Sequence, residues 1–129
     1  MNKIIVEVSI GELLDKVSIL EIKQEKIIDT EKLKFINNEH SVLKDQLDKN
    51  VKSDEKLDKL YQSLKEINSK LWLIEDEKRL CEKEKDFGEK FIKLSRDVHF
   101  LNDDRAKIKL EINNHTGSVI KEIKEYTSY

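Results

Sequence analysis

Apolar residues recur every three or four positions along most of this chain, which is the spacing of amphipathic helices. The first run follows Ser9 and comprises Ile10, Leu13, Val17, Leu20 and Ile27. Ser9 and Glu12 have capping-box spacing, in which side-chain oxygens satisfy free amides at a helix start. The pattern therefore predicts a helix that begins at residue 10, with Gly11 placed for close packing.

Three further runs follow the first. A second helix is predicted to start at residue 29 or 30 and to end at Asn50, a third to cover residues 54–85, and a fourth to end at Gly117. Short connections favour antiparallel neighbours. The fold predicted is all-α, with two antiparallel helical hairpins that form a four-helix, coiled-coil-like arrangement. The third and fourth helices are the longer pair, so their hairpin is expected to project beyond the first or to dimerise.

The N-terminus carries a different pattern. Residues 4–8 include four β-branched residues, which are typical of a strand. A short N-terminal β-strand is therefore predicted, paired either with the C-terminal stretch or with the same strand of a second subunit. We interpret residues 1–129 as a single helical domain: strand 1–9, first hairpin 10–50, long second hairpin 54–116 and C-terminal segment 117–129.

Composition narrows the function classes. Of the 129 residues, 40% are charged, and 27 acidic residues balance 25 basic ones, so no one-sided basic surface for nucleic acid is expected. A chain with one cysteine, Cys81, cannot form a disulfide within a monomer, which fits a reducing compartment. Cys81 falls at a core-type helical position and is expected to be buried. No window reaches the roughly twenty apolar residues of a membrane helix. We therefore expect a cytoplasmic protein that binds neither nucleic acid nor membrane.

Polar residues on the long hairpin form the main candidate site. Asn68, Trp72, Glu75 and Arg79 share one helical face, as do Asn102, Arg105, Lys109 and Asn113 on the next helix. Antiparallel packing would place Glu75 and Asp76 within reach of Asn102 and Arg105. Such a network either sets the register of the hairpin, or lines a ligand-binding cleft, or takes part in catalysis. The candidate ligand or interaction residues are Asp15, Lys16, Trp72, Glu75, Asp76, Arg79, Asn102, Arg105 and Lys109.

The spacing of acidic residues and histidines gives little support for a metal site. No acidic residue precedes a histidine by three, as di-iron helical bundles require. Glu12 and Asp15 have the spacing seen in all-α nucleotide pyrophosphohydrolases that bind magnesium, but acid-rich helices produce this spacing often by chance. No glycine-rich phosphate loop is present. We expect no metal site and no cofactor.

Several stretches together resemble a known family. They are VEVSIGELLDKVSILEIKQEKI, LWLIEDEKRLCEKEKDFGEKFIKLSRDVHFLNDDRAKIKLEIN and GSVIKEIKEY. The family comprises small uncharacterised bacterial and phage proteins that carry a domain of unknown function. The resemblance implies an accessory role in surface-polysaccharide synthesis. It also adds Glu12, Glu21, Lys23, Phe87, Phe91 and Asn113 to the positions that match the family pattern, whereas His99 stands where many relatives carry tyrosine.

Two functions are therefore predicted as alternatives. The leading hypothesis is a non-enzymatic interaction or scaffold module that forms a homodimer and can also bind another protein. The alternative is a small-ligand or magnesium-dependent nucleotide phosphohydrolase-type site at the carboxylate–arginine network.

Overall fold

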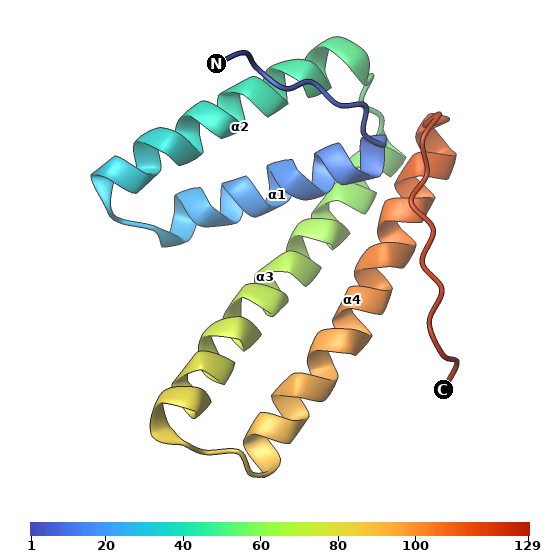
Figure 1. Cartoon of the computed structure of the whole chain (residues 1–129). Helices are drawn as coiled ribbons and strands as arrows, with labels where there is room; N and C mark the ends of the chain where they lie inside the picture. Colours follow the sequence, from blue (N-terminus) through green and yellow to red (C-terminus); the bar gives the residue numbers. More distant parts are fainter.

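The fold consists of four helices, as a computed structural model of residues 1–129 describes it (Figure 1). They are α1 (Ile10–Lys26), α2 (Thr30–Asn50), α3 (Glu55–Glu84) and α4 (Glu89–Thr116). α2 runs back along α1, and α4 runs back along α3 after a short turn. The all-α prediction is confirmed. No helix has an apolar stretch long enough to cross a membrane.

α1 is the central helix of the fold. It packs against α2, α3 and α4, whereas α2 packs against α1 alone. The start of α1 lies very close to α4, because a Cβ atom on Gly11 would come within 2.6 Å of the Lys109 carbonyl oxygen. The far half of the α3/α4 hairpin projects beyond α1 and α2 (Figure 1). The arrangement is therefore a hairpin with a second, shorter pair of helices laid across one end.

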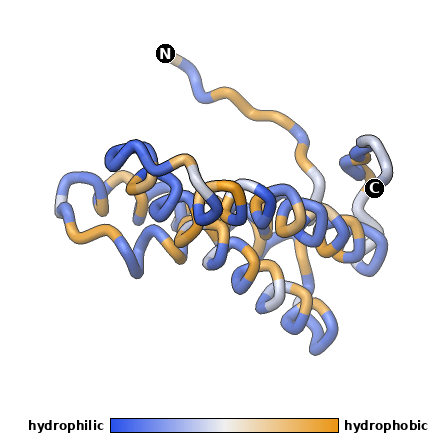
Figure 2. The backbone as a smooth tube through the Cα atoms, turned by 90° about the horizontal axis from the view of Figure 1, so that it is seen from below, coloured by the Kyte–Doolittle hydropathy of each residue, from blue (hydrophilic) through white to orange (hydrophobic).

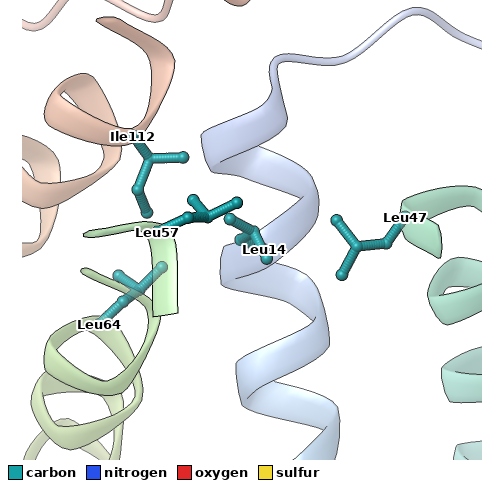
Figure 3. Close-up of a cluster of buried hydrophobic side chains, with 5 residues drawn as sticks. All are labelled: Leu14, Leu47, Leu57, Leu64 and Ile112. Carbon is teal, nitrogen blue, oxygen red and sulfur yellow. The ribbon is translucent and has the colours of Figure 1, made fainter. Parts of the chain in front are cut away.

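The hydrophobic core lies where the four helices meet. Its five buried residues come from all of them: Leu14, Leu47, Leu57, Leu64 and Ile112 (Figure 3). Leu64 and Ile112 are fully inaccessible to solvent. Burying one such side chain stabilises a fold by about 1.5–3 kcal/mol. The core therefore fastens α1 and α2 to one end of the hairpin, and it leaves the far end without equivalent packing.

Side-chain oxygens cap the first three helices. Ser9 Oγ accepts a hydrogen bond of 3.0 Å from the Glu12 amide, and Asp54 Oδ1 accepts one of 2.7 Å from the Leu57 amide. Asp29 does the same for α2. Gly117 ends α4 with a left-handed φ of 68°, as predicted. These caps explain why the sequence pattern located the helix ends well.

The predicted N-terminal β-strand is wrong. Residues 1–9 are extended but belong to no strand, and Ile4 and Ile5 are about nine-tenths exposed, at 91% and 90%. This apolar segment runs away from the helices (Figure 2), whereas the C-terminal segment lies beside α4 (Figure 1). The two segments therefore offer each other no backbone to pair with, and an isolated strand does not form without a partner.

Candidate functional site

Asp15 on α1 is the centre of a buried polar network that joins α1 to the α3/α4 hairpin. Its carboxylate accepts hydrogen bonds from Arg105 Nε at 2.9 Å and Arg105 Nη2 at 2.5 Å, from α4. Asn68 Nδ2, from α3, donates a third at 2.9 Å. A carboxylate and a guanidinium that face each other through two bonds form the strongest kind of ion pair and fix its geometry.

Ser18 completes the network one turn further along α1. Its hydroxyl donates to the Asp15 carbonyl oxygen at 2.7 Å and accepts a 2.8 Å bond from Asn68 Nδ2. Asp15, Ser18 and Asn68 are all buried, and no buried side-chain nitrogen or oxygen in the protein lacks a hydrogen-bond partner. The network is therefore fully satisfied, as buried polar groups in stable folds generally are.

Lys109 forms a second junction beside the first. Its ammonium group donates to Glu12 at 2.7 Å and to Glu122 at 3.0 Å, and it lies 4.0 Å from the Asp15 carboxylate. These contacts join α4 to the start of α1 and to the C-terminal segment. The same end of α1 is also held by the Asn113 side chain, which accepts a 2.7 Å bond from the Gly11 amide.

The network keeps its members charged. Burial raises the pKa of the Asp15 carboxyl, but hydrogen bonds from Arg105 and Asn68 and the charges of Arg105 and Lys109 outweigh it, so this pKa lies below its ordinary value. The hydrogen bond to Asp15 raises the pKa of Arg105. For Lys109, burial lowers the pKa, but the bonds to Glu12 and Glu122 leave it raised.

The hydrogen bonds of the Asp15 network favour a role in holding the helices together over a role in catalysis. The Asp15 carboxylate is occupied by Arg105 and Asn68, and Glu12 reaches Lys109, so neither acid is left free for a proton transfer or a cation. No group of three or more histidine, cysteine, aspartate or glutamate side chains is close enough to hold a metal ion.

A groove lies next to Lys109, between α4 and the C-terminal segment. Its volume is about 930 Å³, and its lining includes Asn102, Ala106, Lys109, Tyr126 and Tyr129. Ala106 presents a small side chain on the α4 wall, and the Tyr129 hydroxyl donates a hydrogen bond to Asp103, another lining residue. The groove adjoins the polar network, because Asn102 and Lys109 belong to both.

The structure brings some of the predicted site residues together and leaves others apart. Asp15, Asn102, Arg105 and Lys109 meet, with Asn102 accepting a 3.3 Å bond from Arg105 Nη1. Lys16 is exposed and lies 4.0 Å from Glu12.

The remaining candidates lie further along α3. Glu75 and Arg79 lie 3.8 Å apart in an exposed i,i+4 pair, Asp76 is exposed and Trp72 is half-buried. The predicted proximity of Glu75 and Asp76 to Arg105 is wrong, because α1 lies across the hairpin and supplies the acid instead.

A second polar cluster was not predicted as a unit. Glu21 on α1 accepts a hydrogen bond from the Tyr61 hydroxyl of α3 and lies 3.4 Å from His40 Nε2 of α2. Lys65 reaches both Glu21 and Glu25. Burial, followed by the bond to Glu21, raises the pKa of Tyr61 well above its usual range. Spacing within one helix does not reveal partners on two others, so the sequence pattern could not bring Glu21, His40 and Tyr61 together.

Comparison with known proteins identifies the family. No curated protein and no solved structure matches this chain significantly. A family profile matches residues 4–129, which is nearly the whole sequence. The chain therefore belongs to DUF6165, a family of unknown function.

Proposed function

We propose that this protein is an oligomeric interaction module whose contact surface is the projecting half of the α3/α4 hairpin. One observation carries the proposal: between residues 69 and 101 only Cys81 and Leu94 are buried. Five large hydrophobic residues in or next to this stretch are between 38% and 55% exposed, namely Leu73, Leu80, Phe87, Ile92 and Phe100.

Exposed apolar side chains gathered on one region favour a binding surface, because isolated soluble domains rarely leave such patches uncovered. The polar network around Asp15 supports the same proposal. It clamps α1 across the base of the hairpin through buried, fully paired groups, so the projecting half extends from a rigid base. A rigid helical surface loses little conformational entropy on binding.

Size-exclusion chromatography with light scattering, at tens of micromolar protein, tests the proposal. We expect the mass of a dimer, and we expect Leu73→Ser and Phe100→Ser to shift it toward the monomer. Phe35→Ser is the matched control, because Phe35 is 77% exposed but lies on α2, away from the hairpin. A wild-type protein that stays strictly monomeric would refute the homo-oligomeric module.

A second candidate function is binding of a small molecule in the groove between α4 and the C-terminal segment. The groove volume of about 930 Å³ falls within the range of ligand sites. Calorimetry with magnesium and a panel of nucleotides and sugar nucleotides tests it. Ala106→Leu, which would fill the α4 wall, should abolish any heat of binding, whereas the exposed Val42→Leu on α2 should leave it unchanged. Absence of binding across the panel would reject these ligand classes.

The accessory role in surface-polysaccharide synthesis stays a prediction from the family resemblance. No contact of the Asp15 network or of the hairpin favours it over another setting for an interaction module.

A further inference from the structure

The C-terminal segment runs back along α4 and ends at the edge of the proposed contact surface (Figure 1). The Tyr129 ring packs edge-on against Phe100, with 5.5 Å between the ring centres, and meets the His99 ring at the same distance. Its hydroxyl donates to the Asp103 carboxylate. Phe100 belongs to the contact surface and is 38% exposed. The segment therefore occupies one side of a residue that a partner would have to cover.

One face of α4 carries both the segment and part of the contact surface. His99, Asp103 and Ala106 line the groove beside the segment, and their spacing of four and three places them on one helical face. The same spacing continues toward the tip of the hairpin with Arg96 and Ile92, which are both exposed. A second helix that packs along this face from the tip would meet the end of the C-terminal segment one turn past Arg96.

Few contacts hold the segment in place. The Ser118 amide donates to the Asn113 carbonyl oxygen at 2.9 Å, and beyond it no residue of the segment forms a backbone-to-backbone hydrogen bond. Every residue from 119 to 129 is exposed, and Tyr129 itself is 78% exposed. Exposed polar contacts stabilise a structure only slightly, and the conformational entropy lost on ordering a chain opposes them. The docked and released positions of Tyr129 are therefore close in free energy.

The length of the segment lets its end separate alone. Residues 118 and 129 are bonded to Asn113 and Asp103, which are ten residues and hence about 15 Å apart along α4. The chain from residue 118 to residue 129 could span about 36 Å when fully extended. The segment is thus slack, and Tyr129 can leave α4 while Glu122 stays bonded to Lys109. Its release consequently leaves the polar network at the base of the hairpin intact.

We propose that the C-terminal segment regulates the contact surface by competing with the partner for Phe100. With Tyr129 docked, one side of the Phe100 ring is occupied and the surface is partly closed. With Tyr129 released, this side of the ring is open to a second copy of the chain. The inference rests on the proposed function, because it concerns access to the same surface.

The size of the effect depends on how often Tyr129 is docked. A partner binds only those molecules whose surface is open, so the apparent dissociation constant rises by the inverse of the open fraction. If Tyr129 is docked about two-thirds of the time, each chain contributes a factor of about three. Both chains of a homodimer must be open, so docking weakens the dimer by about tenfold.

The substitution Tyr129→Ala tests the competition. It removes the ring and the hydroxyl that dock on α4, so the dimer dissociation constant measured by analytical ultracentrifugation should fall by about tenfold. Tyr126→Ala is the matched control and should leave the constant unchanged. Tyr126 lies in the same segment and is 74% exposed, but none of the protein's side-chain hydrogen bonds or ring contacts involves it. Circular dichroism should show the same helix content in all three proteins.

Nuclear magnetic resonance of His99 follows the position of the segment directly. The His99 imidazole lies beside the Tyr129 ring, so its proton signals should shift in Tyr129→Ala. When the wild-type protein is concentrated from monomer to dimer, these signals should move toward their positions in Tyr129→Ala, because association releases the segment. His115, which is bonded to Asp54 at the other end of α4, is the internal control and should keep its signals.

A dissociation constant that is unchanged or higher in Tyr129→Ala would overturn the inference and leave the proposed function intact. A wild-type dimer in which His99 keeps its monomer signals would do the same. A Tyr129→Ala protein that dimerises while the wild type stays monomeric would support the inference and refute the proposed function for the wild-type protein. Monomers in both cases would overturn both.

Discussion

Replacing Arg105 with alanine tests whether the Asp15 network holds the fold together. Arg105 donates two of the three hydrogen bonds to the Asp15 carboxylate, which is 2% exposed. Without it, Asn68 and the more distant Lys109 are the only groups left to stabilise the charge. Removing one member of a buried ion pair costs about 3–5 kcal/mol of unfolding free energy. Because the Arg105 side chain is 27% exposed, we expect the lower end, about 3 kcal/mol at pH 7.

The destabilisation caused by Arg105→Ala should depend on pH in a definite direction. In the wild type the pKa of Asp15 is lowered, so its contribution to stability is fully present above the unfolded-state pKa of about 3.9 and is lost as the pH falls through the folded-state pKa. Removing Arg105 raises the folded-state pKa of Asp15. The destabilisation should therefore be largest near neutral pH and should shrink as the solution is acidified and Asp15 becomes protonated.

Urea unfolding at neutral pH and near pH 4, at one fixed protein concentration, measures both effects. Arg79→Ala is the matched control, since its exposed pair with Glu75 is worth less than about 0.5 kcal/mol. Adding Asp15→Asn to Arg105→Ala should recover part of the loss by removing the unpaired charge. A cost below about 1 kcal/mol at neutral pH, or an equal cost at both pH values, would refute the reasoning.

Three further substitutions probe the packing and the caps by urea unfolding. Gly11→Ala should lower the free energy of unfolding by about 1–3 kcal/mol, because the added Cβ would meet the Lys109 carbonyl oxygen at 2.6 Å. Gly88→Ala is the control and should change it by less than about 0.5 kcal/mol, because its Cβ would meet nothing closer than 3.4 Å. Equal effects of the two substitutions would contradict the close approach of α1 to α4. Ile112→Ala should cost about 2–5 kcal/mol, and a smaller loss would mean that the core collapses around the missing atoms. Ser9→Ala should cost about 1 kcal/mol through loss of the α1 cap, and unchanged stability would show that water replaces the hydroxyl.

Local sequence signals predicted most of the helical structure. Helix starts depend on residues three positions apart, and the end of α4 depends on Gly117, so these features are encoded over short distances. The start of α4 is less well encoded. Asp86 and Glu89 have the spacing of a capping box, but the Asp86 carboxylate accepts from the Gly88 amide at 3.1 Å, and Gly88 takes the cap position. Two short-range hydrogen-bonding patterns competed there, and the spacing did not distinguish them.

Partners far apart in the sequence could not be predicted in the same way. Arg105 was predicted as a candidate, but its partner is Asp15, ninety positions away on a helix that crosses the hairpin. Periodicity places residues on a helical face and says nothing of which helix covers that face. The N-terminal strand failed for the same reason: Ile4 and Ile5 have the local preference for a strand, but strand formation depends on a neighbour that the fold does not supply.

The attachment of α2 to α1 alone has a consequence for local opening. α2 has one buried residue, Leu47, and its backbone packs along α1 alone, so it can separate without breaking the Asp15 network or the contacts between α3 and α4. Segments with few buried contacts open at lower free energy than the global unfolding reaction. Amide hydrogen exchange should therefore be fastest, among the four helices, along α2 and slowest in the middle of α1. The protein would then behave as a stable three-helix unit with one helix that opens and closes on its own.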